Sequence, residues 1–237
     1  MNLIKLEEFK DLFGASSLEV TDVQYDKFVK YADLLVEWNE KINLTAITDP
    51  EGIAVKHFLD SVLPLSMFDL PENASVIDVG TGAGFPGIPL KIMRKDISLT
   101  LMDSLNKRVN FLSEVCSELG IDADCTHERA EDSGKGEKRE KFDIATARAV
   151  ARLSVLAEYC LPFVKVGGAF VALKGSDCQD EIKEAYTAIK TLGGKTEKVL
   201  EYALPTGDKR TLVVIRKITP TPKAYPRPKG KMNKKPL

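Results

Sequence analysis

The sequence has little cysteine and little histidine. Among 237 residues it contains four cysteines and two histidines, and the cysteines form no C-x-x-C pair. Four thiols without paired spacing are too few for a disulfide scaffold, so we expect core cysteines and a reducing, cytoplasmic location. With two histidines and no paired ligand spacing, we expect no zinc or other metal site.

Long apolar segments are also missing. No run of 18 apolar residues occurs, so no membrane span is expected. The N-terminal stretch MNLIKLEEFKDLF mixes acids with apolar residues and lacks a small-residue cleavage site, so we do not expect a signal peptide. A chain of 237 residues suits one α/β domain with an appendage, and it can bury a substantial core.

The net charge is −1, but the charges are unevenly distributed. Residues 216–237 contain eight Lys or Arg and no acid, whereas the remainder holds 26 bases against all 35 acids, a balance of −9. A basic tail on an acidic body is typical of a protein with a polyanionic partner. A solvated, disordered tail is the alternative.

The most informative motif is SVIDVGTGAGFPGIPLKI, residues 75–92. A short apolar run contains Asp78, and glycines follow at positions 80, 82 and 84. Pro86 and Pro89 come next, at places that suit the first turn of a helix. The pattern predicts a buried strand, a tight glycine turn and a helix, with room for a ligand to approach the backbone.

The glycine spacing distinguishes between nucleotide ligands. A dinucleotide fingerprint needs G-x-G-x-x-G, but Phe85 stands where the third glycine belongs. A second acid, Asp103, ends the next apolar run, where a carboxylate can hold both hydroxyls of a ribose. This pattern resembles the cofactor site of class I methyltransferases, which bind S-adenosylmethionine on a Rossmann-like sheet. An ordinary strand-to-helix turn is the alternative.

The N-terminal residues, 1–65, are predicted to form a helical lobe. Residues 21–24 form a capping box before an apolar stripe at helical spacing, which includes Trp38 as a core residue. Residues 48–51 form a second capping pattern, before a helix that carries His57 and Asp60 and ends near Pro64. His57 and Asp60 lie one helical turn apart, where they line the cleft or form a structural pair.

From residue 74 onward, strands are expected to alternate with helices, as in a parallel sheet with crossovers. We expect strands at 75–80, 98–103, 123–127, 142–147, 168–174, 196–202 and 210–218, and helices at 86–94, 106–119, 151–165 and 178–191. The last two strands have no room for a helix between them and should pair antiparallel. Residues 132–141 are interpreted as a solvated, charged loop.

These elements predict an α/β fold of the Rossmann-like, class I methyltransferase type. Its sheet has seven strands, mostly parallel, with a terminal antiparallel hairpin, and the N-terminal helices form an extension. The predicted division of the chain is a helical lobe at 1–65, a methyltransferase domain at 66–219 and a basic, proline-rich tail at 220–237.

Longer motifs narrow the resemblance to one family. They are YADLLVEWNEKINLTAI (31–47), HFLDS (57–61), DVGTGAGFPGIPL (78–90), KFDIATARAVA (141–151), GGAFVALKG (167–175) and YPRPKGKMNKKPL (225–237). Together they resemble the glucose-inhibited division protein B family, also called the small-subunit ribosomal RNA methyltransferase G family. The resemblance covers nearly the whole chain, although Met232 stands where the family tail has proline.

The resemblance implies an activity and a partner. Family members transfer a methyl group from S-adenosylmethionine to N7 of a guanine in 16S ribosomal RNA, in the loop near the decoding centre. The implied substrate is free 16S RNA, the 30S subunit or an assembly intermediate, and the sequence does not distinguish among these three. The alternatives are a class I methyltransferase that acts on a small molecule or a protein, and a non-catalytic RNA-binding protein that retains the cofactor fold.

The resemblance and the motifs together give a set of cofactor contacts. Ala130 and Glu131 follow the third strand, at the sheet edge where the adenine lies, although Glu131 could be a surface acid. Arg148 follows the fourth strand in a segment of small residues, and it is the candidate for placing the substrate; a surface ion pair is the alternative. The predicted cofactor-binding residues are Gly80, Gly82, Phe85, Asp103, Ala130, Glu131 and Arg148.

The chemistry requires no catalytic acid or base. Guanine N7 has an in-plane lone pair and no proton to lose, so the enzyme must only hold it in line with the methyl group. The cysteine nucleophile of C5-pyrimidine methyltransferases is not needed, and neither is the N-P-P-Y-like segment of amino-group methyltransferases. We therefore name no catalytic residue.

The remaining candidates are RNA contacts. Lys174 ends the fifth strand, where it could meet a phosphate or be solvated. Prolines are expected to keep the tail extended, so that its bases follow the RNA backbone and its removal leaves cofactor affinity nearly intact. Alternatively, part of the tail packs on the sheet edge with Tyr225 as its anchor. The predicted RNA contacts are Lys174, Arg227, Lys229 and Lys231.

Overall fold

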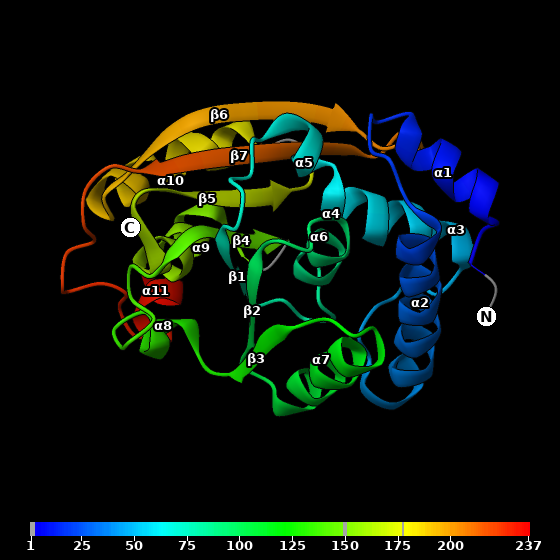
Figure 1. The fold of residues 1–237 in the computed structure, drawn as a ribbon. Helices are drawn as coiled ribbons and strands as arrows, with labels where there is room; N and C mark the ends of the chain where they lie inside the picture. The colour runs from blue at the N-terminus through cyan, green and yellow to red at the C-terminus, as the bar shows by residue number, and fades with distance from the viewer. Residues whose placement is uncertain (1–2, 149–150, 177) are drawn as a thin grey trace.

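The computed structural model describes residues 3–148, 151–176 and 178–237, and within them the chain forms a seven-stranded sheet with helices on both faces (Figure 1). The sheet order is β3-β2-β1-β4-β5-β7-β6. The strands are β1 (Ser75–Val79), β2 (Ser98–Asp103), β3 (Ala123–His127), β4 (Phe142–Arg148), β5 (Val164–Lys174), β6 (Gly194–Ala203) and β7 (Lys209–Lys217).

The strand directions follow from the connections. Strands β1 to β5 pair in parallel, because each is joined to the next by a crossover that contains a helix. Strand β7 runs antiparallel to both β5 and β6, and the short connection from Leu204 to Asp208 joins β6 to β7. The predicted seven-stranded, mostly parallel sheet with its terminal antiparallel hairpin is confirmed.

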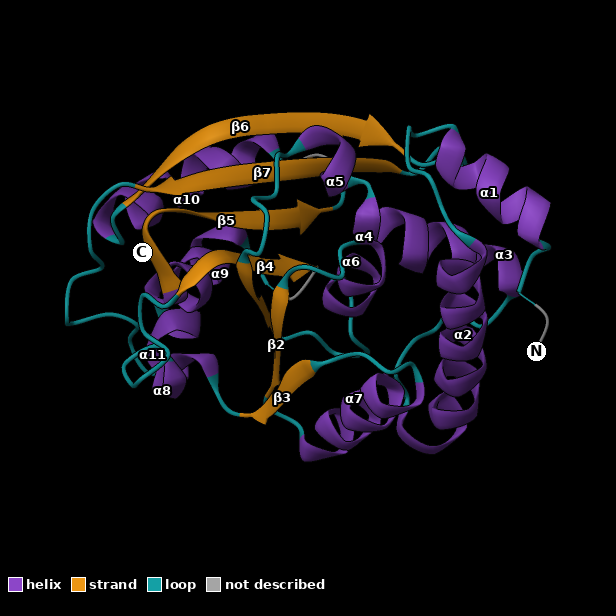
Figure 2. Ribbon diagram, in the orientation of Figure 1, coloured by secondary structure: helices purple, strands orange, loops and turns teal. Residues whose placement is uncertain are grey.

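The helices, coloured purple in Figure 2, fall into an N-terminal group, a crossover group and one C-terminal helix. The N-terminal group is α1 (Leu6–Gly14), α2 (Asp22–Ile42), α3 (Pro50–Gly52), the π-helix η1 (Ile53–Leu59), α4 (Asp60–Val62) and α5 (Pro64–Met67). The others are α6 (Gly87–Met93), α7 (Asn106–Glu118), α8 (Ala130–Ser133), α9 (Leu153–Cys160), the 3-10 helix η2 (Leu161–Phe163), α10 (Gln179–Thr191) and α11 (Lys229–Lys234).

Successive strand residues alternate between two hydrophobic cores. In β1, Val76 belongs to the core shared with α1, α2, α6 and α7, whereas Ile77 belongs to the core shared with α9 and α10. In β5, Val171 and Ala172 divide in the same way. This alternation is the period of two expected of a strand, and here both faces are apolar because helices cover both.

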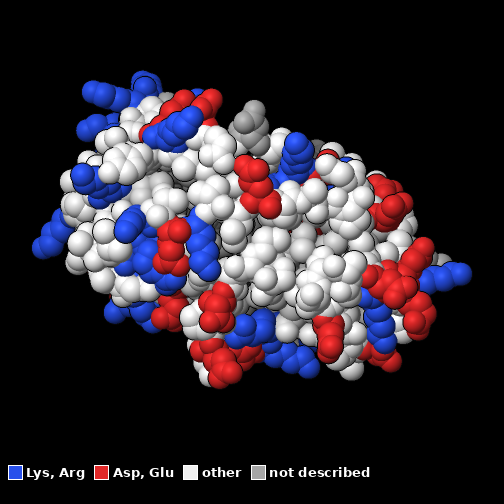
Figure 3. All heavy atoms as spheres, turned by 90° about the horizontal axis from the view of Figure 1, so that it is seen from above, with Lys and Arg blue, Asp and Glu red and all other residues white. Residues whose placement is uncertain are grey.

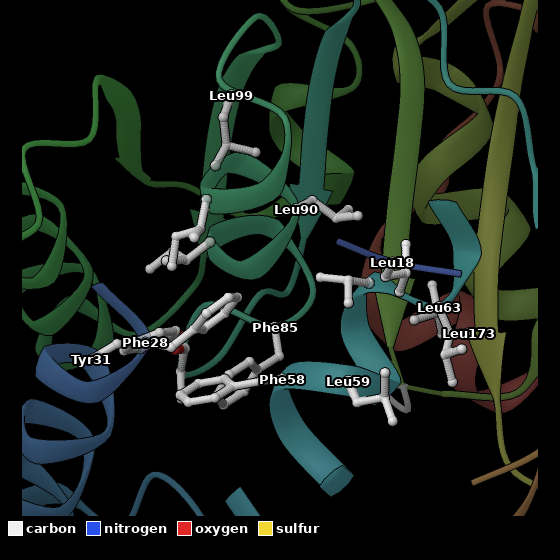
Figure 4. Packing of buried hydrophobic residues seen from close by; sticks show 14 of the residues in the cluster. Leu18, Phe28, Tyr31, Phe58, Leu59, Leu63, Phe85, Leu90, Leu99 and Leu173 are labelled. Carbon is white, nitrogen blue, oxygen red and sulfur yellow. The ribbon is translucent and has the colours of Figure 1, made fainter. Parts of the chain in front are cut away.

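The N-terminal helices pack on the first core through the predicted stripe. The capping box at 21–24 is present, since Thr21 and Gln24 exchange hydrogen bonds at the start of α2. Trp38 is partly buried against this core, and its Nε1–H donates to Glu114 on α7 at 3.0 Å. Figure 4 shows the rings of Phe28, Tyr31, Phe58 and Phe85 gathered between α2, η1 and the loop after β1. The division of the chain into three parts stays a prediction.

The helix predicted over 151–165 is too long. Helix α9 ends at Cys160, a short 3-10 helix follows, and β5 already begins at Val164. Pro162 explains the break, because its ring removes a backbone donor and clashes within a continuing α-helix. The buried ammonium of Lys217 donates to the carbonyls of Leu161 and Val164, at 2.7 and 3.3 Å, and fixes the chain there.

Three further expectations from the sequence are wrong. The capping pattern at 48–51 predicts Thr48 as the helix cap, but the cap is Asp49, whose Oδ1 accepts the Gly52 N–H at 2.7 Å. Residues 132–141 are not simply a solvated loop, because the Arg139 guanidinium donates to carbonyls of the tail. The tail is not extended throughout either, since residues 229–234 form α11.

Candidate cofactor and substrate site

The glycine loop after β1 is folded onto the end of β2. The N–H groups of Gly80 and Thr81 donate to the carbonyl of Met102, at 2.8 and 3.1 Å. Gly80 and Gly82 have φ of +69° and +61°, in the left-handed region that favours glycine. The Tyr31 hydroxyl of α2 donates to the Ala83 carbonyl, so the N-terminal lobe also holds the loop.

Asp78 of β1 holds the glycine loop through hydrogen bonds to its side chain. Its side chain is fully buried, and its Oδ2 accepts the Thr81 hydroxyl at 2.6 Å and the Gly87 N–H at 2.8 Å. Burial raises the pKa of Asp78 to about 6, although these two hydrogen bonds favour the carboxylate. Among the described residues, Asp78 Oδ1 has no hydrogen-bond partner.

Asp103 ends β2 beside this loop and is 3% exposed. Its Oδ2 accepts the Gly82 N–H at 3.0 Å, and its Oδ1 accepts the Leu105 N–H at 2.9 Å. The Arg108 guanidinium lies 3.5 Å from Oδ2. A carboxylate accepts about four hydrogen bonds, so Asp103 retains lone pairs for further donors such as ribose hydroxyls.

Four of the predicted cofactor residues, Gly80, Asp103, Ala130 and Glu131, line one cavity of about 220 Å³. Gly82 lies next to it through its bond to Asp103. Glu131 is 7% exposed and so is not a freely solvated surface acid. The other lining residues are Val79, Met102, Ser104, Glu128, Arg129, Ala151, Val155, Leu156 and Tyr159.

The cavity suits a nucleoside with one polar and one apolar end. Asp103 offers carboxylate oxygens where a ribose needs acceptors, and Val79, Met102 and Leu156 offer apolar walls where a purine ring needs contact. The residues therefore fit S-adenosylmethionine, which carries a ribose and an adenine but no pyrophosphate. The walls from α9 were not predicted from the sequence, because Val155, Leu156 and Tyr159 form part of an ordinary apolar helix with no local motif.

Phe85 and Arg148 belong to a neighbouring cluster. Arg148 ends β4 with 16% of its side chain exposed, and its guanidinium carbon lies 4.7 Å from the centre of the Phe85 ring. One guanidinium nitrogen donates to the Lys56 carbonyl at 3.1 Å, and the other lies 3.3 Å from His57 Nδ1. The cluster thus joins the sheet to η1 of the N-terminal lobe.

His57 is a neutral member of this cluster. Its ring stacks on Phe85 at 4.5 Å, its Nδ1 faces the Arg148 donor, and its Nε2 lies 2.7 Å from the Thr45 hydroxyl. Because a guanidinium can only donate, Nδ1 is the acceptor and the proton resides on Nε2. Burial and the charge of Arg148 lower the pKa of His57 to about 3.

This lowered pKa predicts how stability depends on pH. In the unfolded chain His57 takes up a proton near pH 6.5, whereas in the folded protein it does so only near pH 3. The stability contributed by neutral His57 is therefore present above pH 6.5 and falls as the pH is lowered. Between pH 7 and 5, wild type should lose about 2 kcal/mol relative to His57→Gln. Urea unfolding of both proteins across this range measures the difference. Parallel stability curves would show that native His57 takes up its proton near pH 6.5, as it does in the unfolded chain.

Asp60 connects this cluster to the terminal hairpin. The residue is 4% exposed, and its Oδ2 accepts from Arg210 Nε of β7 at 3.0 Å and lies 3.7 Å from Arg148. The Tyr202 hydroxyl of β6 donates to Oδ1 at 3.3 Å. His57 and Asp60 are therefore joined through Arg148, and both face a second cavity of about 250 Å³, lined by Ile47, Lys56, His57, Asp60, Arg148, Leu173, Lys174, Gly175 and Arg210.

The second cavity is rich in hydrogen-bond donors. Lys56 and Arg210 were not anticipated as site residues, since nothing in the local sequence marks them and only the fold brings β7 to η1. The predicted RNA contact Lys174 also lines this cavity, but its ammonium pairs with Glu181 and donates to the Ala151 carbonyl, both at 2.8 Å. The contact of Lys174 with RNA stays a prediction, and its ammonium would have to exchange these internal partners for a phosphate.

The predicted RNA contacts of the tail have different environments. Arg227 forms an ion pair with Glu158 inside the protein, with 12% and 1% of the two side chains exposed, so its charge is used internally. Lys231 is exposed. The side chain of Lys229 lies outside the described part of the structure.

The described residues contain no group of three His, Cys, Asp or Glu side chains arranged to hold a metal ion. None of their helices has the length and apolar character needed to cross a membrane.

Comparison with known families decides the assignment. The family model for GidB, rRNA small subunit methyltransferase G, matches residues 24–213. The chain belongs to the rRNA small subunit methyltransferase G family. As a member of this family it is an S-adenosylmethionine-dependent methyltransferase, as the motifs predicted.

Other proteins of the rRNA small subunit methyltransferase G family are similar over most of their length. Those named Ribosomal RNA small subunit methyltransferase G include one from Desulforamulus reducens, 53% identical over 222 residues that cover 92% of each chain. The protein of that name from Lactobacillus johnsonii is 54% identical and covers 98% of this chain and 99% of its own.

Solved structures agree on the fold of this rRNA methyltransferase family member. A SAM-dependent methyltransferase from Aquifex aeolicus matches with a TM-score of 0.54 at 19% identity, over 70% of this chain and 93% of its own. M. jannaschii TYW2 in complex with AdoMet matches with a TM-score of 0.50 at 15% identity, over 64% of this chain and 72% of its own. At these identities the likeness concerns the fold alone.

Proposed function

We propose that this protein transfers the methyl group of S-adenosylmethionine to N7 of a guanine in 16S ribosomal RNA, in the loop near the decoding centre. The observation that carries the proposal is a pair of cavities at the carboxyl edge of the sheet, one at the ends of β1 and β2 and the other at the ends of β4 and β5. Lys174 in the lining of the second donates to the carbonyl of Ala151 in the lining of the first. One fits a nucleoside cofactor, and the other is lined by cationic side chains that suit RNA. We expect the reaction in the cytoplasm, where ribosomal subunits are assembled.

The first cavity would hold the cofactor. Asp103 would accept the ribose hydroxyls, Gly80 would let the ligand approach the backbone, and Ala130 and Glu131 would border the adenine. The bound cofactor supplies an electrophilic methyl group on its sulfonium. The residues of the chain bind and orient it and exclude water.

The second cavity would hold the guanine. Guanine presents an acceptor at O6 beside N7, and a guanidinium can donate to O6 while it leaves the N7 lone pair free to attack the methyl group. Arg148 lies at the end of β4 and is fixed by His57, Asp60 and Phe85, so it is a rigid donor at the place where substrate and methyl group meet. Positioning of this kind contributes roughly 7–11 kcal/mol to lowering a barrier, and N7 needs no base.

A methyl-transfer assay with three acceptors tests the proposal. Radiolabelled S-adenosylmethionine is incubated with the enzyme and with 30S subunits, naked 16S RNA, or a mixture of small molecules and unrelated proteins. Label in 30S subunits or 16S RNA supports the proposal. Label only in the small acceptors or proteins would make the protein a different methyltransferase, and no label in any acceptor would leave a non-catalytic RNA-binding protein.

The exposed lysines of the tail are expected to contribute to RNA affinity. Lys231, Lys234 and Lys235 lie on or next to α11, and in Figure 3 Lys and Arg gather toward the end of the molecule where β7 runs into the tail. Replacing the three lysines by alanine should weaken RNA binding and reduce the slope of log K against log salt by about 2, because each phosphate contact on single-stranded RNA contributes roughly 0.7.

Filter binding at several salt concentrations measures this slope. A triple alanine variant of Lys5, Lys30 and Lys41 is the matched control. These exposed bases lie just before α1 and on α2, at the opposite end of the molecule (Figure 1). Equal slopes for wild type and the tail variant would show that the tail does not contact RNA.

A further inference from the structure

The tail, residues 220–237, is folded against the two helices that line the cofactor cavity. Figure 1 shows α11 beside α8 and α9. Residues Ala130 and Glu131 of α8, and Val155, Leu156 and Tyr159 of α9, line the cavity. The tail itself contributes no lining residue among those described, so it lies behind these walls.

The contact with α9 is made by Arg227 and Glu158. Glu158 is 1% exposed and accepts from three donors of Arg227: the backbone N–H at 2.7 Å, Nε at 2.8 and 3.1 Å to the two carboxylate oxygens, and a terminal guanidinium nitrogen at 2.6 Å. The other terminal nitrogen donates to the Lys235 carbonyl at 3.0 Å, after the end of α11. A carboxylate buried on a helix needs such partners, so α9 in this position depends on the tail.

The contact with α8 is made through Arg139. Its guanidinium donates to the Gly134 carbonyl at the end of α8 at 2.9 Å, and to the tail carbonyls of Tyr225 at 2.8 Å and Thr221 at 2.6 Å. The ring of Pro226 packs on Gly134, because a Cβ at that glycine would lie 3.2 Å from Pro226 Cγ. One tail segment therefore holds both helices.

Met232 holds α11 in place. Its side chain has no exposed surface, and its N–H donates to the Pro228 carbonyl at 3.2 Å. A proline at this position could not make that bond. The methionine thus fixes the helix whose end receives the Arg227 hydrogen bond, while Lys231 and Lys234 remain exposed.

We infer that the tail positions the walls of the cofactor cavity, and that the Arg227–Glu158 pair thereby sets the affinity for S-adenosylmethionine without touching it. Helices of four and eight residues, as α8 and α9 are, are not stable alone and take their position from packing. The inference rests on the proposed assignment of the cavity to the cofactor. It reverses the expectation from the sequence that removal of the tail leaves cofactor affinity nearly intact.

The test compares Arg227→Ala with Arg227→Lys and with the control Lys223→Ala, which removes a tail base that faces solvent. Calorimetry at 25 °C gives the dissociation constant for S-adenosylmethionine, and filter binding gives RNA affinity. Arg227→Ala should weaken cofactor binding about tenfold, in the range found for substitutions remote from a ligand. Arg227→Lys should restore part of the loss, and Lys223→Ala should bind the cofactor like wild type.

A second measurement uses only the wild-type protein, so it tests the inference even if Arg227→Ala does not fold. Because coupling between sites is reciprocal, cofactor binding should slow amide hydrogen exchange in residues 221–235 of the wild-type protein. A merely stabilising pair would change the melting temperature but neither this exchange nor the dissociation constant of the folded variant.

The outcomes separate the two proposals. The positioning role alone would be overturned if wild type binds S-adenosylmethionine and the folded Arg227→Ala variant binds it with the same affinity. It would also be overturned if cofactor binding leaves hydrogen exchange in the tail of the wild-type protein unchanged. Failure of the wild-type protein to bind S-adenosylmethionine would overturn the cofactor assignment and the inference with it.

Discussion

The Asp103→Ala variant is expected to bind S-adenosylmethionine about 100-fold more weakly than wild type, or worse. Asp103 would accept two ribose hydroxyls, and hydrogen bonds to a charged group contribute ~1.5–3 kcal/mol each. Two such bonds amount to ~3 kcal/mol or more, which is about two decades in affinity. Isothermal titration calorimetry measures the change directly.

Two controls keep this result specific. Asp124→Ala removes an exposed acid from the neighbouring strand β3 and should leave the affinity unchanged. Asp103→Asn keeps an acceptor for the Gly82 N–H but removes the charge, so its affinity should fall between wild type and Asp103→Ala. Near-wild-type binding by a folded Asp103→Ala protein would remove Asp103 from the cofactor site.

The Arg148→Ala variant should lose turnover more than cofactor affinity. The guanidinium lies over Phe85 and binds the Lys56 carbonyl, in the cluster beside the second cavity and not in the wall of the first. We expect kcat to fall about 100-fold, the effect of a substrate misplaced by roughly 1 Å, and the dissociation constant of S-adenosylmethionine to change little.

Single-turnover methylation and calorimetry on the same preparations separate these effects. Arg152→Ala is the matched control, because Arg152 is an exposed arginine paired with Glu184 on the surface. Arg148→Lys should recover only part of kcat, since an ammonium cannot reproduce the planar guanidinium contacts with Phe85 and Lys56. Equal losses in turnover and cofactor binding would make Arg148 a plain cofactor ligand.

Much of the fold could be predicted because local chemistry determines it. The glycines at 80 and 82 require positive φ, alternating apolar residues mark the strands, and the short connection after Ala203 leaves no room for a helix. Asp103 could be placed in the site because a strand end is fixed by the strand itself. The helix expected over 151–165 was wrong at its end. The apolar residues continue beyond Cys160 and suggested a longer helix, although Pro162 favours an end before it.

The rest of the site depends on contacts between distant segments. Arg210 reaches Asp60 across 150 residues of sequence, and no local motif predicts that meeting. Phe85 and Arg148 were predicted to contact the same cofactor as Asp103; in the structure they pack with His57 of η1, and their contact with the cofactor stays a prediction. In the tail, composition correctly indicated a basic segment, yet the ion pair with Glu158 on a distant helix leaves only 12% of the Arg227 side chain exposed.

Mapping the methylated base tests the central claim most directly. 30S subunits and naked 16S RNA are treated with the enzyme and S-adenosylmethionine, the RNA is cleaved chemically at 7-methylguanine, and primer extension locates the break. The proposed function predicts one new stop, dependent on enzyme and cofactor, at a single guanine in the loop near the decoding centre. Methyl incorporation into 16S RNA without such a stop, or a stop elsewhere in the molecule, would contradict it.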